Sequence, residues 1–448
     1  MSDILSEKIW PRGATRDRDG VVCVGGIRTT DLVSEFGTPI FVLDEDDFRA
    51  RARQWRMAFE DTFGADKFSV YYAGKAFISI AVAKWVAEEG LGLDVCTGGE
   101  FAIATSANFP TSRIAFHGNN KSLDEIENAI TARVGIIIVD SFYELERVAQ
   151  AALAQAVVQK ILLRVTPGVE AHTHEFIATA HEDVKFGFSI NTGAAAEAVR
   201  LALASPHLEL KGLHSHIGSQ IFDTEGFEIA AHRVIGLLGA IRDEHGVELE
   251  SLDLGGGYGI AYVETDDPLS PDALAQGLYE IVKVECDSHG LEIPHISIEP
   301  GRAIAGPSTV TIYTVGTVKV VALDGGKNRS YVSIDGGMSD NIRTALYDAD
   351  YTAVLANRLS TESFSASRVV GKHCETGDIV VRDVELPSDI TPGDLLVTPA
   401  TGAYGRSMAS NYNHVPRPPV VAVRNGTARL IVRRETQEDL MRLEVAEG

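Results

Sequence analysis

Eight short runs of β-branched and apolar residues, each ending in a small or polar side chain, limit the folds open to this chain more than any other feature. Such runs are typical of buried strands. The stretches between them are longer and often rich in alanine. In residues 78–89, 122–132 and 142–155, apolar residues recur three or four positions apart, as in amphipathic helices. The eight runs are FSVYYAGK (68–75), LGLDV (91–95), RIAFHG (113–118), GIIIVDS (135–141), KILLRV (160–165), LKGLHSH (210–216), LESLDLGGG (249–257) and HISIEP (295–300).

Strand and helix alternating eight times between Phe68 and Pro300 predicts a (β/α)8 barrel, which we assign to residues 45–300. After the barrel the pattern changes to strand-like segments, such as 308–322 and 377–386, that are separated by Gly, Pro and Asp. The chain before the barrel also contains strand-like pieces. We therefore expect an α/β protein with a barrel and a mostly β second domain built from both chain ends, residues 1–44 and 301–448.

Charge and cysteine content exclude several classes of protein. The net charge is −23, from 63 acidic and 40 basic residues, and such a surface disfavours nucleic acid and anionic lipid as partners. None of the four cysteines forms a C-x-x-C pair, which disfavours a zinc site or a redox pair. The N-terminus has no signal pattern, and no apolar run reaches the roughly 20 residues that span a bilayer. We expect a soluble cytoplasmic protein with reduced thiols and a small-molecule substrate.

Polar residues that end the predicted strands are the candidates for chemistry, because barrel enzymes place their sites at the carboxyl ends of the strands. Lys75 ends the first run, where a desolvated lysine can bond covalently to an aldehyde cofactor. A solvated surface lysine is the plain alternative. His214 and His216 end the sixth run, and two residues two apart on a strand share a face. They fit either a metal pair or an imidazole stacked on a ligand ring.

The seventh run ends in glycines suited to an anion, and a carboxylate and an arginine that could bind a ligand lie at the end of the eighth run. Three glycines, 255–257, allow backbone N–H groups to approach a phosphate closely, and this fold often binds phosphate after strands seven and eight. Glu299 and Arg302 follow in EPGRAI. A carboxylate there can hold a protonated ring nitrogen and an arginine can hold a phosphate or carboxylate, whereas a simple ion pair across the turn is the alternative.

Two further motifs lie in the C-terminal part. Cys374, in HCETGD, offers a thiol that can act as a general acid or nucleophile, although a lone cysteine is more often a small buried residue. Tyr404 lies in the glycine-rich loop TGAYGRS, where a structural role in a turn is the alternative. Each signal is modest alone. Taken in their order along a barrel, the motifs supply a lysine that can bond to an aldehyde and an imidazole that can stack on a ligand ring. They also supply hydrogen-bond donors for a phosphate and a carboxylate for a ring nitrogen.

With these motifs in this order, the chain resembles the pyridoxal-phosphate-dependent barrel decarboxylases from about Trp10 to Val445. HSHIGSQ, DLGGGYG, EPGRA, CETGD and GAYGRSMASNYN are similar to the diaminopimelate decarboxylases in particular, and WPRGATRDRDGVVCVGGI, FHGNNKS and RLIVRRET to their actinobacterial branch. The resemblance implies an alanine-racemase-like barrel, pyridoxal 5'-phosphate as cofactor, and conversion of meso-2,6-diaminopimelate to L-lysine and CO2. It also implies a homodimer whose active sites are completed across the interface.

The resemblance also implies roles for individual residues. Lys75 would carry the cofactor, and Cys374, reaching the site from the other subunit with Glu375, would donate the proton that replaces the carboxylate. Thr376 stands where the family usually has serine, and it keeps the hydroxyl. No metal is expected. The other residues implied to bind cofactor are Asp94, His216, Ser219, Gly256, Gly257, Glu299, Gly301, Arg302 and Tyr404, and those implied to bind substrate are Arg302, Arg343, Tyr347, Glu375 and Tyr404.

Three other interpretations compete with this one. The chain could decarboxylate another basic amino acid or racemise one, although a racemase needs a second base on the opposite face of the cofactor ring. It could be a catalytically silent cofactor-binding homologue, but such a protein would be expected to lack Lys75 or Cys374. It could be a metal-dependent barrel hydrolase that uses His214 and His216, which leaves Lys75 and Glu299 without a shared role.

Overall fold

The computed structural model describes residues 5–168 and 185–445, which form two compact units. One unit consists of Arg51–Gly259 and Pro268–Gly301. The other consists of Met1–Ala50, Ile260–Asp267 and Arg302–Gly448, so it takes in both chain ends and one short segment from the middle. No helix in the described part of the chain is long and apolar enough to cross a membrane.

The first unit is a closed barrel of parallel strands, as the sequence predicts. Within the described residues, eight strands follow one another around the barrel, and the ring is closed because β13 pairs with β5 and β8 pairs with β9. Each strand lies where one of the eight apolar runs predicted it. The strands are β5 (Phe68–Ala73), β6 (Gly92–Val95), β7 (Ile114–Phe116), β8 (Ile136–Val139), β9 (Gln159–Thr166), β11 (Leu208–His214), β12 (Ser251–Asp253) and β13 (His295–Ile298), with the short β10 (Phe188–Ser189) beside β9.

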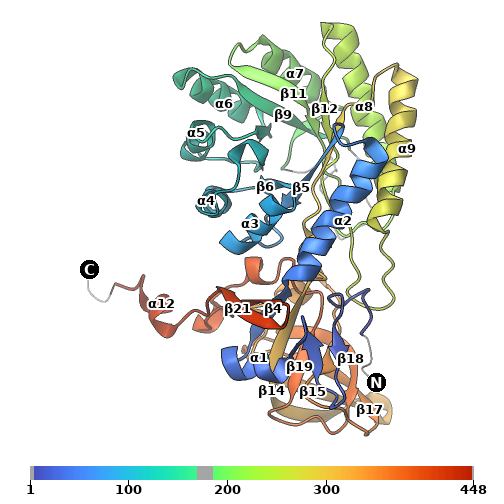
Figure 1. Cartoon of the computed structure of the whole chain (residues 1–448), viewed down its shortest axis with the longest axis vertical. Helices are drawn as coiled ribbons and strands as arrows, with labels where there is room; N and C mark the ends of the chain where they lie inside the picture. Colours follow the sequence, from blue (N-terminus) through green and yellow to red (C-terminus); the bar gives the residue numbers. More distant parts are fainter. Residues whose placement is uncertain (1–4, 169–184, 446–448) are drawn as a thin grey trace. The chain divides into compact units, whose positions relative to one another are not determined.

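A helix separates each of these strands from the next, and the helices lie around the outside of the barrel (Figure 1). Parallel strands covered in this way are buried on both faces, which explains why their sequences are continuous apolar runs and do not alternate. The helices of this unit are α3 (Ile80–Glu88), α4 (Gly98–Ser106), α5 (Leu123–Thr131), α6 (Phe142–Ala154), α7 (Ala194–Ala204), α8 (Glu225–His245) and α9 (Pro271–His289), and α2 (Glu45–Phe63) leads into β5.

Serine and threonine residues set where several of these helices begin. The side chains of Ser79, Thr97, Ser122, Ser141 and Ser270 each accept a hydrogen bond from the backbone N–H three residues later. These bonds satisfy N–H groups that have no partner within the helix, and each such cap is worth about 1 kcal/mol. The caps therefore fix the turn between strand and helix and hold the strand ends in place.

The second unit is built mainly from strands contributed by both chain ends, as the sequence predicts. β4 (Ile40–Asp44), from the N-terminal part, pairs with β14 (Thr309–Ala322) on one side and β20 (Val420–Arg424) on the other. The remaining strands of this sheet are β15 (Asn328–Ile334), β16 (Val354–Leu355), β17 (Phe364–Val370), β18 (Ile379–Pro387), β19 (Leu395–Thr398) and β21 (Thr427–Val432). Because β4 is a central strand, the N-terminal residues are an integral part of this domain.

Among the described residues, a small sheet and four short α-helices complete the second unit. The sheet contains β1 (Thr15–Arg16), β2 (Val22–Val24) and β3 (Ile27–Arg28), and its apolar residues join one hydrophobic core with those of β4, β14 and β20. The helices are α1 (Thr29–Phe36), α10 (Arg302–Ala305), α11 (Arg343–Tyr347) and α12 (Gln437–Met441).

Candidate active site

The carboxyl ends of the barrel strands bring the predicted barrel residues together. All strands of the closed barrel run parallel, so their carboxyl ends meet at one mouth. Lys75 follows β5, Asp94 lies on β6, His214 ends β11, and Glu299 follows β13. The glycines 255–257 follow β12. Residues separated by more than 200 positions in the sequence therefore line one site.

Lys75 and Asp94 form the first pair of this site. The Nζ atom of Lys75 lies 3.9 Å from Oδ2 of Asp94, and the lysine side chain is 39% exposed while the aspartate side chain is completely buried. Burial raises the pKa of Asp94, and the neighbouring His117 and Lys75 oppose that rise. The Oδ2 atom has no hydrogen-bond partner among the described residues. The barrel mouth therefore contains a buried carboxylate oxygen of Asp94 beside the partly exposed amine of Lys75.

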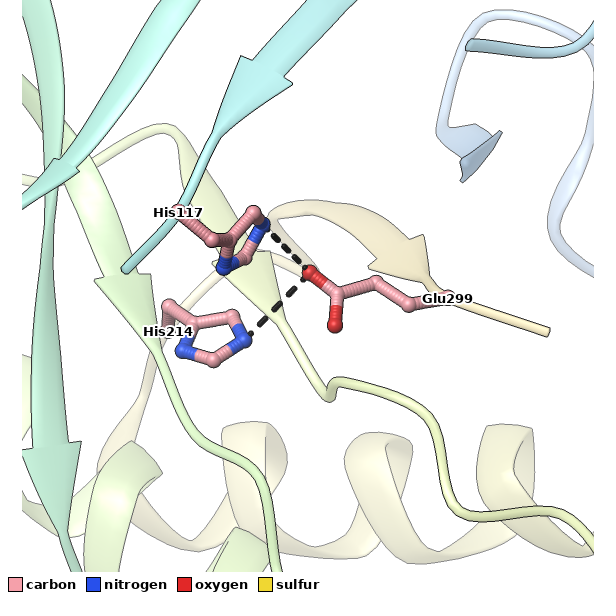
Figure 2. A group of neighbouring side chains, drawn as sticks. All are labelled: His117, His214 and Glu299. Atoms are coloured by element: carbon pink, nitrogen blue, oxygen red, sulfur yellow. Dashed lines mark ion pairs between the residues drawn. The ribbon is translucent and has the colours of Figure 1, made fainter. Parts of the chain in front are cut away.

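Glu299 lies between two imidazoles, as Figure 2 shows. Its Oε1 atom lies 2.8 Å from Nε2 of His117 and 3.4 Å from Nε2 of His214, and all three side chains are buried. Burial alone would raise the pKa of Glu299, but the two imidazoles hold that pKa well below its usual value. Neither contact has hydrogen-bond geometry, so this oxygen lacks a hydrogen-bond partner within the described chain. Glu299 is thus an ionised carboxylate with an unsatisfied acceptor.

Among the described residues, the two histidines of the HSH motif do not belong to one group of possible metal ligands. β11 ends at His214, so the strand alternation that would place both rings on one face stops before His216. His214 lies with His117 and Glu299, and burial lowers its pKa to about 4. The Nδ1 atom of His216 accepts a hydrogen bond from the N–H of Gly256 at 3.1 Å. Burial, followed by the charges of Lys75 and Arg164, holds the pKa of His216 well below its usual value, so both rings are neutral at neutral pH.

The glycines after β12 are required by close packing of the backbone. A Cβ atom on Gly256 would lie 2.4 Å from the carbonyl oxygen of Glu299, and one on Gly257 would lie 2.3 Å from that of Gly218. Gly257 also has φ of +104°, which side chains rarely adopt. Gly301 is similarly confined, because its Cβ would lie 2.8 Å from that of Ala73. Ser219 follows Gly218 in the loop after β11. These turns form a closely packed glycine cradle at the carboxyl ends of the strands.

Two residues of this mouth were not singled out from the sequence. His117 follows β7 and contacts Glu299. Arg164, on β9, is half-buried, with Nη1 3.8 Å from Oδ1 of Asp140 and its guanidinium carbon 4.2 Å from the centre of the Phe186 ring. Both residues lie at the ends of the apolar runs RIAFHG and KILLRV, so the rule that chemistry follows strand ends could have identified them.

The other predicted residues belong to the second unit, where Arg302, Arg343 and Tyr404 lie in one cluster. The guanidinium carbon of Arg302 lies 4.8 Å from the centre of the Tyr404 ring. Arg302 and Arg343 both stack on Tyr262, which the sequence did not single out. Arg343 and Tyr347 are the first and last residues of the short helix α11. Arg343 is buried and Tyr347 is half-buried.

Cys374 and Glu375 lie on an exposed loop whose neighbours hold it firmly. The Tyr412 hydroxyl donates a hydrogen bond to Oε1 of Glu375 at 2.9 Å. The buried ring of His373 has its Nε2 atom 2.8 Å from Oγ of Ser339 and its Nδ1 atom 3.0 Å from Oδ1 of Asn413. The Cys374 thiol is exposed. The loop thus presents a thiol and a carboxylate side by side on the surface of this chain.

A cavity at the other end of the barrel contains none of the predicted residues. It has a volume of about 380 Å³ and lies at the amino ends of β5, β6 and β7, where Arg56, Tyr71 and Arg113 line it. That end of such barrels usually serves stability, and the cluster of strand-end side chains at the opposite mouth is the better candidate for catalysis.

Comparison with known proteins identifies the family. Residues 45–306 match the family of the pyridoxal-dependent decarboxylases, specifically its pyridoxal binding domain. The chain is 56% identical over 445 residues to diaminopimelate decarboxylase of Mycobacterium tuberculosis, covering 98% of each chain. It is 45% identical over 430 residues to that of Bacillus subtilis, covering 96% of each.

A solved structure agrees with these relatives. The crystal structure of diaminopimelate decarboxylase from M. jannaschii in complex with L-lysine matches with a TM-score of 0.89 and 31% identity, covering 98% of this chain and 99% of that one. The match extends over both units, so it includes the barrel and the β domain. The chain therefore belongs to the diaminopimelate decarboxylases, which are pyridoxal-phosphate-dependent carboxy-lyases.

Proposed function

We propose that this chain converts meso-2,6-diaminopimelate to L-lysine and CO2, the last step of lysine biosynthesis. Its family supports the reaction, and one observation supports the site: an amine, a buried ionised carboxylate and a glycine cradle share one barrel mouth. Those three features match the aldehyde, ring nitrogen and phosphate of pyridoxal phosphate. The match includes two buried acceptors, Oδ2 of Asp94 and Oε1 of Glu299, that have no hydrogen-bond partner among the described residues.

The residues present at the barrel mouth thus fit the cofactor. Lys75 would bond to the aldehyde, Glu299 would face the ring nitrogen, and the neutral ring of His216 would stack on the pyridine. The turns at Gly257 and Gly301 would offer backbone N–H groups to the phosphate, and Ser219 would offer its hydroxyl. The complete set proposed to hold the cofactor is Lys75, Asp94, His216, Ser219, Gly256, Gly257, Glu299, Gly301, Arg302 and Tyr404.

The protein's own groups would manage the protons of the reaction. Bound pyridoxal phosphate supplies an electron sink for the carbon that loses CO2. Glu299, whose pKa is held well below its usual value chiefly by His117, would hold the proton on the ring nitrogen. The Sγ–H group of Cys374 would give its proton to the carbon that retains the electron pair when CO2 leaves, and the resulting thiolate would regain a proton from solvent.

Substrate recognition would use charges of both signs. The buried guanidinium of Arg343 can bind a substrate carboxylate, and the carboxylate of Glu375 can bind an ammonium group. The far end of meso-diaminopimelate carries both groups, whereas ornithine and lysine lack the second carboxylate. This complementarity favours meso-diaminopimelate over other basic amino acids. The substrate-binding set proposed is Arg302, Arg343, Tyr347, Glu375 and Tyr404.

We also propose a homodimer in which Cys374 and Glu375 complete the site of the partner subunit. Their exposure on a single chain supports this arrangement, because a proton donor must be enclosed with its substrate. Mixing tests it: Lys75→Ala and Cys374→Ala subunits, each inactive alone, would regain about a quarter of wild-type activity after coexpression, because half the dimers contain one intact site. No recovery would place both groups in one subunit.

The proposed reaction is tested with purified protein and meso-diaminopimelate. We expect a visible absorbance band from the lysine-bound cofactor, release of CO2 and formation of lysine, all lost in Lys75→Ala. A band without lysine formation would overturn the substrate assignment, and ornithine and arginine assayed in parallel would reveal another decarboxylase. Failure to develop a band after addition of pyridoxal phosphate would overturn the cofactor site, and metal analysis of the same sample would test the hydrolase alternative.

A further inference from the structure

We infer that Tyr351 and Tyr262 are positioning residues that hold Arg343 and Arg302 as a rigid receptor for the carboxylates of the substrate. This inference deepens the proposed function and rests on it. It assigns selectivity for a dicarboxylic amino acid to two tyrosines as well as to the arginines themselves. The five residues of this receptor are Tyr262, Arg302, Arg343, Tyr351 and Tyr404, all in the second unit.

Hydrogen bonds fix the direction of each guanidinium. Nη1 of Arg343 donates to the Tyr351 hydroxyl at 2.6 Å, and Nη1 of Arg302 donates to the Tyr262 hydroxyl. All four side chains are buried. An arginine side chain has several rotatable bonds, so a bond at its tip removes freedom that carboxylate binding would otherwise have to restrict.

Ring faces hold the same two groups from the side. The guanidinium carbon of Arg343 lies 4.6 Å from the centre of the Tyr262 ring and 5.6 Å from that of Tyr351. That of Arg302 lies 5.9 Å from the Tyr262 ring and 4.8 Å from the Tyr404 ring. The Tyr262 and Tyr351 rings meet edge to face, 5.1 Å apart at 72°. Tyr262 therefore lies between the two arginines and couples their positions.

The charge of Arg343 is left available by this arrangement. Among the described residues, the contacts of its guanidinium are with phenol groups, and none is an ion pair with a carboxylate. Its Nε atom is buried without a hydrogen-bond partner in the described chain. Burial raises the pKa of Tyr351, which Arg343 opposes, so the phenol stays neutral at neutral pH. A buried cation held by neutral partners attracts an anion strongly, because little water screens it.

The backbone brings Tyr351 back to the arginine. α11 ends at Tyr347, and Asp348 has φ of +52°, which turns the chain after one short helix. The N–H of Ala349 donates to the carbonyl oxygen of Arg343 at 3.4 Å. This turn allows a tyrosine eight positions after Arg343 to contact its side chain.

Tyr351→Phe tests the inference because it keeps the ring and removes only the hydroxyl. In the holoenzyme we expect KM for meso-diaminopimelate to rise about tenfold, with kcat within about twofold of wild type, since a hydrogen bond to a charged group is lost from binding. Two competitive inhibitors separate the charges: pimelate has both carboxylates without amines, and 1,5-diaminopentane has the amines without carboxylates. The inhibition constant of pimelate should rise about tenfold and that of the diamine should not change.

Controls distinguish positioning from packing. Tyr331→Phe, at a half-buried tyrosine of β15 near Arg368, should leave KM and both inhibition constants at their wild-type values. Tyr262→Phe should raise the inhibition constant of pimelate, as Tyr351→Phe should. If one of the two variants folds poorly, the other still tests the inference. Unchanged pimelate inhibition in both variants, or equal weakening of pimelate and diamine, would overturn the inference.

The same data separate this inference from the proposed reaction. Wild-type protein that binds pimelate but does not decarboxylate meso-diaminopimelate would contradict the proposed reaction, but it would not contradict the inferred carboxylate receptor. If wild-type protein forms lysine but the two tyrosine variants bind pimelate as tightly as wild type, the proposed reaction is supported and the inferred receptor is contradicted.

Discussion

The Nε2 atom of His117 lies 2.8 Å from Oε1 of Glu299, although 181 residues of sequence separate the two end-of-strand positions. β7 and β13 place them at the same barrel mouth, and both side chains are buried. His117 is the main neighbour that holds the pKa of this carboxylate well below its usual value, in surroundings that would otherwise favour its neutral form. This relationship supports Glu299 as the partner of the cofactor ring nitrogen.

Replacing Glu299 with glutamine tests that role. The neutral amide cannot hold a proton on the ring nitrogen, so we expect kcat to fall about 100-fold or more, with an altered spectrum of the bound cofactor. Steady-state kinetics and visible absorbance measure the two effects. Glu292→Gln, at an exposed residue of the same unit, serves as the matched control. Wild-type kcat in Glu299→Gln would contradict the assignment.

Gly257→Ala tests the phosphate cradle. The added Cβ would lie 2.3 Å from the Gly218 carbonyl oxygen, at φ of +104°, so the turn must shift. We expect the affinity for pyridoxal phosphate to fall about tenfold or more, measured by titrating the apoenzyme and following absorbance. Gly236→Ala in α8 is the control, because its Cβ would meet the His289 ring at an ordinary 3.6 Å. Equal affinity in both variants would rule out a tight cradle at Gly257.

Cys374→Ser tests the proton donor. A hydroxyl is a far weaker acid than a thiol, so we expect kcat to fall about 100-fold while the cofactor spectrum stays as in wild type. The exposed position of Cys374 makes a folding defect from this change unexpected. Cys286→Ala, at a buried cysteine of α9, should retain kcat even if its melting temperature falls. Full activity in Cys374→Ser would show that another group delivers the proton.

Asp340 gives the protein a pH-dependent stability that one substitution should remove. Burial raises its pKa to about 7, although its Oδ1 atom accepts a hydrogen bond from Tyr313 at 2.5 Å. Between about pH 4 and 7 the folded state therefore retains a proton that the unfolded state has lost. Stability from this group is present at low pH and is lost as pH rises through about 7.

Asparagine mimics the protonated acid, so Asp340→Asn should flatten the decline of the melting temperature between pH 5 and 8. The gain at pH 8 should correspond to a few kcal/mol. Thermal unfolding across this range measures the effect, and Asp324→Asn, at an exposed residue of the same unit, is the control. A parallel decline in wild type and Asp340→Asn would exclude Asp340 as its source.

Local patterns in the sequence were sufficient to predict the barrel. Eight apolar runs and their intervening amphipathic stretches reflect periodicities of strand and helix that neighbouring residues determine. Because parallel strands of a barrel share one mouth, the residues ending those runs, including Lys75 and Glu299, could be grouped before any contact was known. The strand character of both chain ends likewise predicted a joint β domain.

Contacts between distant segments decided the rest. The position of β4 between β14 and β20 depends on pairing across more than 250 residues, which no local pattern encodes. The placement of His117 against Glu299, and of Tyr262 and Tyr351 around two arginines, depends on packing angles and side-chain conformations. Sequence by itself thus determined the barrel, its reactive edge and the residue types available there. Tertiary structure alone decided which side chains meet, since burial and distance, which set charge and orientation, arise only when the segments pack together.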